Sequence, residues 1–528
     1  MEQRSLPSRS LKHPASPLPQ GWGYRIPLAI LSGVLLSAGF LADALFFTAW
    51  FALVPLLLAL EGVKQQRMAM GLGLITGLVT HLLGFYWLVD TMVRFGGIPY
   101  PISLLLFLLI ATAFGFIHLL FALGYCWGHR RVPAGSLRQA LFIATLYTAL
   151  EFLYPHVFPW RLGNTQIAWL PLVQIADVTG VYGITFLVVL VNALLFQGVV
   201  SLREKPVPFP WRSMVVTGLL LGLTIGYGYR RLDQVQRAVD SAPRLRVALL
   251  QPNIDVKMKY DQRFAEEQLL ILALLSRQVI AEGAELVVWP ETAYRYWVYA
   301  DAQSIPLPLA PPPNVHLLIG ANTFNPKAPV VEKFNSALLL DAEGKVLGRY
   351  DKHRLLMFGE YVPFARYFPF LQGISPAIGD FTPGYGEVTL QLPGGLTLAP
   401  LICYEDIFPS LAREAVQKGA QVLVNLTNDA WFGPTRAPYQ HQLLARFRAI
   451  ETRRPLIRAT NTGVTSVIDP SGTLVAEAKI YIKAAIVQDI PLLKTETIYT
   501  RWGDAFALLT VLGTATWIWP KRPGGELA

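Results

Sequence analysis

The chain has 528 residues, of which 53% are apolar and only 15% are charged, and its formal net charge is +10. Soluble globular chains carry about 25% charged residues, so this composition excludes a disordered protein and fits a purely soluble one poorly. Two cysteines in the whole chain exclude a disulfide-stabilised scaffold. The basic excess can indicate nucleic acid, but basic residues also gather beside membranes, so their positions decide between the two.

Apolar segments are concentrated in the first half of the chain. A run of about 20 apolar residues can cross the hydrocarbon core of a bilayer, which is roughly 30 Å thick. Seven such segments precede residue 230 and an eighth closes the chain: 25–40, 43–61, 69–92, 102–127, 139–154, 175–200, 212–229 and 503–519. No small-residue cleavage site follows the first, so we do not interpret it as a removed signal peptide. The sequence therefore predicts a membrane α-helical bundle of 8 transmembrane helices.

Lys and Arg residues are distributed unevenly between the two sides of this predicted bundle. With the N-terminus inside, the short outer loops hold only Arg94 and Arg161. The inner segments hold Arg4, Arg9, Lys12, Arg25, Lys64, Arg67, Arg130, Arg131, Arg138, Arg203, Lys205, Arg212, Lys521 and Arg522. This positive-inside bias explains much of the basic excess without a nucleic-acid partner. We therefore expect both termini on the cytoplasmic side and residues 230–500 on the outer face.

Residues 230–500 have the pattern of a soluble α/β domain. Apolar β-rich runs occur at 245–250, 286–289, 315–319, 337–340, 396–402 and 422–426, and helical stretches lie near 261–281, 408–418 and 436–452. The sequences at 341–344 and 469–472 are typical of hairpin turns. The predicted domains are a bundle with seven helices at 1–229, an outer α/β domain at 230–500, and a closing helix with a short inner tail at 501–528.

One of the two cysteines has the context of a nucleophile. Cys126 and Cys403 fall on opposite sides of the membrane and cannot pair, which leaves Cys403 as a free thiol in a compartment that normally oxidises thiols. The run 398–406 predicts an apolar strand that ends at Cys403, then a polar turn and a helix. A strand end holds a nucleophile rigidly, and the helix N-terminus would favour a thiolate. The alternative is a buried, inert cysteine.

Two other strand ends offer chemical partners for this thiol. Glu291 directly follows the apolar run 286–289, and Lys352 follows Gly348 and Arg349. A carboxylate can accept the proton of the thiol, and an ammonium can stabilise a thiolate or an oxyanion. Either residue alone has the alternative interpretation of a solvated surface charge, and spacing cannot show that the three converge.

The motifs around these three residues carry a family resemblance. Glu291 in VVWPE, Lys352 in RYDKHRL and Cys403 in LICYED resemble the Glu-Lys-Cys triad of the nitrilase, or carbon–nitrogen hydrolase, superfamily. With the apolar spans and the motifs FGEYVP (358–363), NLTNDAWFG (425–433) and YTRWGD (499–504), the whole chain resembles the bacterial apolipoprotein N-acyltransferases. It departs from their pattern at Pro252, where Gly is expected, and at Met357, where Pro is usual.

The resemblance implies a fold and a mechanism. The outer domain would be a nitrilase-like α-β-β-α sandwich, outside the bacterial inner membrane. Glu291 would act as general base, Cys403 would take an acyl chain from a phospholipid as a thioester, and Lys352 would stabilise the oxyanion. The acyl chain would pass to the N-terminal diacylglyceryl-cysteine of an apolipoprotein. Supporting roles are implied for the carboxylates of Glu360 and Glu405 and for the backbone near Tyr404.

Further residues are predicted with less direct support. Substrate contacts are expected at Tyr260, Trp297, Phe381, Asn428 and Trp431, although the aromatic residues among them could equally serve packing. Residues 371–386 could form a mobile flap or a plain connector. His353 and His441 are expected at the surface or in a polar core. We expect no cofactor and no metal, and a monomer in contact with the lipid bilayer.

Two other functions are compatible with parts of the sequence. A membrane-tethered amidase or nitrilase would use the same triad but pass the acyl group to water. A transporter would use ionisable residues inside the spans, which are His81, His118, Glu151 and Asp177, because such residues are costly in lipid and often mark function. These four form no evident pairs, which disfavours a transport path.

Overall fold

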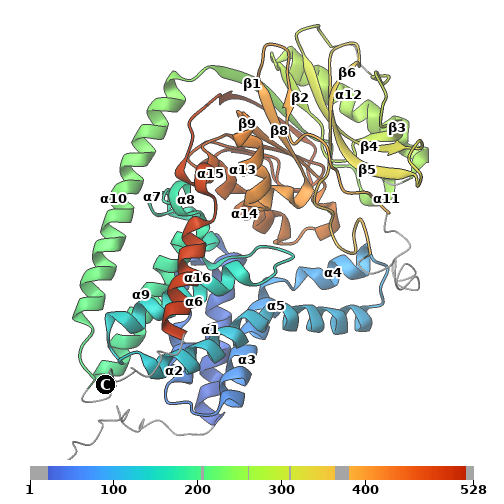
Figure 1. The fold of residues 1–528 in the computed structure, drawn as a ribbon. Helices are drawn as coiled ribbons and strands as arrows, with labels where there is room; N and C mark the ends of the chain where they lie inside the picture. Colours follow the sequence, from blue (N-terminus) through green and yellow to red (C-terminus); the bar gives the residue numbers. More distant parts are fainter. Residues whose placement is uncertain (1–21, 204–206, 260, 309–310, 363–379, 519–528) are drawn as a thin grey trace, which may run out of the picture.

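The computed structural model describes residues 22–203, 207–259, 261–308, 311–362 and 380–518. An α/β domain lies at one end of a group of helices, and the long helix α10 (Trp211–Ser241) runs alongside that group up to the first strand of the domain (Figure 1). The C-terminal helix α16 (Ala505–Ile518) returns among the other helices, beside α6 (Leu137–Leu153). The chain therefore leaves the helical part, forms the domain, and returns.

The helical part is built from apolar helices of different lengths. Five described segments are long and apolar enough to cross a membrane: Trp22–Leu41, Asp43–Leu60, Gln66–Gly84, Tyr100–Arg131 and Val181–Arg203. They contain α1 (Trp22–Leu41), η1 (Asp43–Trp50), α2 (Val54–Leu60), α3 (Gln66–Gly84), α5 (Tyr100–Gly128), η2 (His129–Arg131) and α9 (Val181–Arg203). Several apolar helices thus form the N-terminal region, whereas the expected count of eight spans is not confirmed by length and composition.

Two of the predicted spans are interrupted at glycines. The segment 69–92 divides into α3 and α4 (Trp87–Arg94), because Gly84 ends α3 where the ring of Trp160 packs against it. The segment 175–200 divides into α8 (Ala176–Thr179) and α9, with Gly180 between them at a φ of 62°. Glycine adopts this left-handed conformation without strain. Short apolar runs do not reveal such breaks.

Small residues let the helices approach closely. A Cβ atom added at Gly77 of α3 would lie 2.1 Å from the carbonyl oxygen of Gly115 in α5. Close approach at small residues is typical of helix packing in membranes, where van der Waals contact replaces the hydrophobic effect. The α3–α5 pair is therefore tightly packed.

The α/β domain contains two facing sheets. Among the described residues, the first sheet has the order β13-β1-β2-β4-β5-β6, with β3 also paired to β4, and the second has the order β12-β11-β10-β9-β8-β7. The strands of the first sheet are β1 (Arg244–Gln251), β2 (Leu286–Val288), β3 (Tyr294–Tyr299), β4 (His316–Asn325), β5 (Glu332–Leu340), β6 (Val346–Asp351) and β13 (Ala484–Pro491). Those of the second are β7 (Leu390–Gln391), β8 (Thr397–Ile402), β9 (Val422–Thr427), β10 (Leu456–Thr460), β11 (Ser466–Ile468) and β12 (Leu474–Glu477).

Helices cover the outer faces of both sheets. Helix α12 (Ala265–Ala281) packs on the first sheet, and α13 (Pro409–Gln417) and α14 (Ala437–Thr452) pack on the second. The domain is therefore an α-β-β-α sandwich, as predicted. Both predicted hairpins are confirmed, since β5 pairs antiparallel with β6 and β11 with β12.

Buried polar contacts fasten the domain to the helices. Asp177 of α8 accepts hydrogen bonds from Arg231 of α10 and from Arg453 at the end of α14, each at 2.7 Å. Gln440 of α14 donates to the carbonyl oxygen of Gly84 at 3.1 Å and accepts from Trp87 at 2.9 Å. Truncating one partner of such a buried ion pair is strongly destabilising, so these contacts fix α14 against the bundle.

Candidate active site

Glu291 lies in the turn that follows strand β2. Thr292 takes a left-handed backbone conformation with a φ of 49°. Strand β4 packs directly against this turn at Gly320. A Cβ atom added to Gly320 would lie only 2.4 Å from Pro290 O and 2.7 Å from Glu291 Cα. Only glycine leaves this space. Packing against β4 therefore fixes the backbone that carries Glu291.

Lys352 follows strand β6, and its ammonium group is buried between two carboxylates. Nζ lies 2.9 Å from Glu360 Oε1 and 3.4 Å from Glu291 Oε1. Asn335 of β5 lies between the two acids and donates Nδ2–H to Glu291 Oε1 at 2.7 Å and to Glu360 Oε1 at 2.9 Å. Its backbone carbonyl also accepts from the Lys352 amide at 2.8 Å. Asn335 thus positions all three charged side chains.

Cys403 follows strand β8, so the thiol comes from the other sheet. Its φ of 56° is in the left-handed region, which non-glycine residues adopt rarely and mostly at functional sites. Asn425 of the adjacent strand β9 donates to the Cys403 carbonyl at 2.7 Å and holds the turn in place. The charged groups that act on the thiol are Glu291, Lys352, Asp429 and Glu360. The three predicted strand ends therefore meet where the two sheets face each other.

Glu405 connects the turn at Cys403 with the turn at Lys352. Its carboxylate accepts hydrogen bonds from the backbone amides of Ile402 at 2.7 Å, His353 at 2.7 Å and Arg354 at 2.9 Å. It also accepts from the Tyr350 hydroxyl at 2.8 Å. One donor immediately precedes Cys403, and the other three lie within two residues of Lys352. Glu405 therefore fixes the distance between the two turns.

The thiol of Cys403 and the ammonium of Lys352 are both held in their protonated forms. Burial raises the pKa of the Cys403 thiol well above its ordinary value, with Glu291 adding to the shift and Lys352 opposing it. Burial disfavours the Lys352 ammonium, but Glu360 and Glu291 outweigh that effect and hold its pKa well above the ordinary value. The site therefore contains a neutral thiol beside a permanent cation.

The prediction that a helix N-terminus favours a thiolate is wrong. The residues after the nucleophile form the short turn η6 (Cys403–Ile407), and α13 begins only at Pro409. A five-residue turn offers little of the dipole of a longer helix, whereas the surrounding burial disfavours the anion. Burial therefore outweighs any effect of this short segment on the pKa of the Cys403 thiol.

A second lysine borders the same cluster. Lys259, at the end of α11 (Val256–Lys259), donates Nζ–H to the backbone carbonyl of Glu291 at 2.7 Å. Burial lowers its pKa to about 7, although Glu291 opposes that shift. Lys259 and Asn335 both make polar contacts at Glu291 that the sequence did not reveal. For Asn335 the available signal is an amide within an otherwise apolar strand.

Two family models match separate parts of this chain. The carbon-nitrogen hydrolase model matches residues 246–498, and the model of the apolipoprotein N-acyltransferase N-terminal domain matches residues 32–194. An apolipoprotein N-acyltransferase of Geobacter metallireducens is 38% identical over 92% of this chain and 93% of its own length. The chain belongs to the apolipoprotein N-acyltransferase family. Relatives with the same description from Bdellovibrio bacteriovorus and Chlorobaculum tepidum are 30% and 32% identical over 93% and 90% of this chain, and over 93% and 92% of their own lengths.

The predicted substrate residues of this apolipoprotein N-acyltransferase family member are dispersed. Trp297 of β3 is 44% exposed, and its ring stacks on Phe381 with centroids 6.3 Å apart. Trp431 instead contacts Phe95 beside the bundle, at 5.2 Å between centroids. Tyr260 and residues 371–379 of the predicted flap lie outside the described residues.

Asn428 leads into a buried charged network behind the nucleophile. Asn428 is buried and accepts from Asn461 at 3.1 Å. The next residue, Asp429, lies 2.9 Å from His441 Nδ1, and Asp406 lies 2.8 Å from His441 Nε2 and 2.9 Å from Arg458. Burial lowers the pKa of His441, but Asp406 and Asp429 raise it to about 9 overall. His441 therefore belongs to the polar core, as one of the two predicted alternatives stated.

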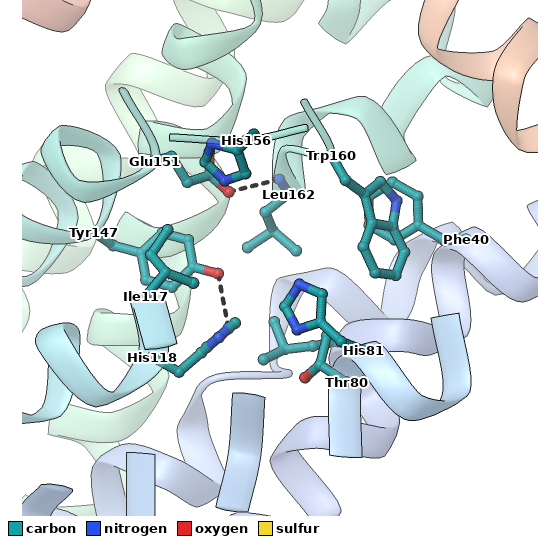
Figure 2. Close-up of a pocket in the computed structure, with 11 residues that line it drawn as sticks. Phe40, Thr80, His81, Ile117, His118, Tyr147, Glu151, His156, Trp160 and Leu162 are labelled. Atoms are coloured by element: carbon teal, nitrogen blue, oxygen red, sulfur yellow. Dashed lines mark hydrogen bonds between the residues drawn. The ribbon is translucent and has the colours of Figure 1, made fainter. Parts of the chain in front are cut away.

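The ionisable residues of the bundle surround a different cavity. Figure 2 shows His81, His118, Tyr147 and Glu151 around a small cavity. Glu151 accepts from the Leu162 amide at 2.7 Å and from the Thr185 hydroxyl at 2.8 Å. His118 Nε2 lies 3.4 Å from the Tyr147 hydroxyl. Asp177 is absent from this cavity because Arg231 and Arg453 hold it at the domain interface.

Proposed function

We propose that this protein transfers an acyl chain from a phospholipid to the N-terminal amine of a diacylglyceryl apolipoprotein, through a thioester on Cys403. The observation that carries the proposal is the buried arrangement of a neutral thiol, two carboxylates and a permanent ammonium at one point. Membership of the apolipoprotein N-acyltransferase family supports the identity of donor and acceptor.

The first half-reaction loads the enzyme. Glu291 takes the proton of the Cys403 thiol as the sulfur attacks the ester carbonyl of the phospholipid. Lys352 uses two of its three N–H bonds on Glu360 and Glu291, which leaves one for the oxyanion that develops. When the tetrahedral adduct collapses, the C–O bond breaks and the proton on Glu291 passes to the lysophospholipid oxygen. The product is an acyl-thioester.

The second half-reaction discharges the thioester. The α-amine of the acceptor attacks the thioester carbonyl, Glu291 accepts the amine proton, and the C–S bond breaks. The proton then returns to the Cys403 sulfur. Glu360 positions Lys352, and Glu405 fixes the spacing of the two turns. Neither step needs a cofactor.

The placement of the domain follows from the substrates. Both carry acyl chains that stay in the bilayer, so a site seated on the outer leaflet can receive them laterally. We place eight spans in the membrane at α1, η1–α2, α3, α5, α6, α9, α10 and α16, with both termini cytoplasmic and residues 230–500 extracytoplasmic. The positive-inside bias of the loops supports this topology, in the inner membrane of a bacterium.

The transfer reaction is tested with purified protein, a phospholipid and a diacylated lipopeptide in mixed micelles. We expect a triacylated lipopeptide and a lysophospholipid in equal amounts, measured by mass spectrometry. Free fatty acid as the sole acyl product, or ammonia released from an amide substrate, would assign the triad to a membrane-tethered hydrolase instead.

A further inference from the structure

A buried lysine outside the triad contacts Glu291 at its backbone. Lys259 is only 2% exposed, and its ammonium group donates to the Glu291 carbonyl oxygen at 2.7 Å. The carboxylate of the same glutamate lies 3.4 Å from Lys352 Nζ. Glu291 therefore contacts one lysine through its main chain and another through its side chain.

The segment that carries Lys259 is anchored at both ends. Before α11, the amide of Ile254 donates to Asn461 Oδ1 at 3.0 Å, and its carbonyl oxygen accepts from Asn461 Nδ2 at 2.9 Å. Within α11, the carbonyl oxygen of Met258 accepts from Gln268 of α12 at 2.7 Å. Because the residue after β10 and helix α12 both hold this backbone, the fold itself places the Lys259 ammonium beside Glu291.

The lysine of the triad is shared between two carboxylates. Lys352 Nζ lies 2.9 Å from Glu360 Oε1 and 3.4 Å from Glu291 Oε1, and Asn335 donates to the same two oxygens. Two carboxylates that share one site repel each other, which favours protonation of one of them. A protonated Glu291 cannot accept the proton of a thiol. A further positive charge beside Glu291 counteracts this effect.

Lys259 supplies a positive charge at this place. An ammonium group is costly to bury unless it is paired, and burial lowers the pKa of Lys259 to about 7. Glu291 opposes that shift most strongly, Arg295 adds to it, and Cys403 opposes it. The attraction between Lys259 and Glu291 is therefore the main electrostatic effect that retains the charge on the buried amine.

We propose that Lys259 is a positioning residue for acyl transfer and acts through Glu291, since it holds the turn that carries the base and favours its proton-accepting carboxylate. The inference rests on the proposed function, in which Glu291 takes the proton of the Cys403 thiol. The competing interpretation is a structural lysine that satisfies a buried carbonyl group. The two interpretations differ in the pH dependence of the reaction.

The test follows thioester formation on Cys403 as a function of pH. Full-length wild-type protein and the Lys259→Met variant are loaded from phospholipid in single turnovers, and the intact mass is recorded after quenching. Removal of a cation makes the Glu291 carboxyl easier to protonate, so the acidic limb of the rate profile should move up by about one pH unit. On that limb the variant should load about tenfold more slowly than wild type, and on the plateau its rate should lie within about threefold.

Two further variants and a control separate the charge from the packing of the side chain. Lys259→Gln also removes the charge and should give the same shift of the acidic limb. In a Glu291→Gln background, Lys259→Met should change the loading rate by less than about twofold, because the group through which Lys259 acts is already lost. Lys327→Met changes an exposed lysine that pairs with Asp301 and should keep the wild-type profile.

Two results would overturn the inference in favour of a structural lysine. One is a lower rate with an unmoved acidic limb in both Lys259→Met and Lys259→Gln. The other is full additivity of the Lys259→Met and Glu291→Gln losses in the double variant. Absence of any thioester in the wild-type protein would instead contradict the proposed function.

A second measurement covers the case in which neither lysine variant folds. Glu291→Gln retains Lys259, and the coupling between two sites is reciprocal, so loss of the carboxylate should lower the pKa of Lys259 below about 7. The pH dependence of trace reductive methylation, read on the peptide that contains Lys259, compares this pKa between wild type and Glu291→Gln. An equal pH midpoint in the two proteins would overturn the inference.

Discussion

The membrane bundle and the α/β domain each bury a cluster of ionisable side chains, but the two clusters are organised differently. In the bundle, Glu151 accepts from a backbone amide and a threonine hydroxyl, and His118 meets a tyrosine. In the domain, Lys352 lies between two carboxylates beside a buried thiol. Burial of ionisable groups occurs in both places. The domain cluster alone of the two combines a thiol, carboxylates and a fixed cation, and it is the one that we propose to be reactive.

The largest difference is expected between the two cysteines. Cys403→Ala removes the atom that carries the acyl chain, so product formation should fall by at least about 10³-fold, as for other nucleophiles in covalent catalysis. Cys126→Ser, near the C-terminal end of α5 where the thiol is buried, is the matched control and should keep the wild-type rate. Rates are measured as triacylated lipopeptide formed per minute. Comparable losses in both variants would remove the distinction between the two thiols.

A paired change of two buried glutamates sharpens the comparison. Glu291→Gln keeps the shape of the side chain but cannot accept the thiol proton, so thioester formation should slow by about 10²–10⁴-fold. Glu151→Gln in the bundle retains an acceptor for the Leu162 amide and should change the rate by less than about threefold. Single-turnover loading, followed by quenched mass spectrometry, measures both. Unimpaired loading of Glu291→Gln would require another base.

Glu405 is predicted to affect both stability and rate. In Glu405→Gln one acceptor oxygen becomes an NH₂ group that faces backbone donors, and unsatisfied partners of a charged acceptor cost about 2–3 kcal/mol. The midpoint of thermal unfolding in detergent should fall, and the loading rate should fall with it because the Cys403 and Lys352 turns separate. Glu387→Gln changes an exposed carboxylate and serves as the control. An unchanged midpoint in Glu405→Gln would contradict the coupling of the two turns.

The smallest expected effect is a pH dependence of stability. The pKa of His441 is raised to about 9 in the folded protein, against about 6.5 in an unfolded chain. The stabilisation is therefore complete below pH 6.5 and is lost as pH rises through 9. Wild type should lose stability over this window relative to His441→Gln, as monitored by thermal unfolding. If the midpoint of thermal unfolding depends on pH in the same way in both proteins, His441 does not carry the positive charge.

The sequence predicts Glu291, Lys352 and Cys403 as a triad because each follows an apolar strand and lies in a distinct motif, and the structure brings the three together. It could not place Asn335 or Lys259, since their contacts with Glu291 depend on how β5 and α11 pack in space. The sequence also did not show that the helices are interrupted at Gly84 and Gly180. These interruptions arise where each glycine packs against an aromatic ring that is distant in the sequence. The sequence does not indicate how strongly the Cys403 thiol is buried, and this burial is what raises its pKa. Local sequence patterns therefore predict the strands and helices, whereas the contacts and the burial of the site residues depend on long-range packing.

The central claim is a covalent acyl-enzyme on Cys403, and a chase experiment tests it most directly. Wild-type protein is incubated with phospholipid alone, and its intact mass and Cys403 peptide are recorded before and after a diacylated lipopeptide is added. The account predicts a mass increase of one acyl chain on Cys403, which disappears as the same chain appears on the lipopeptide amine. Product formation with Cys403 unmodified at every time point, or with the acyl chain on another residue, would contradict it.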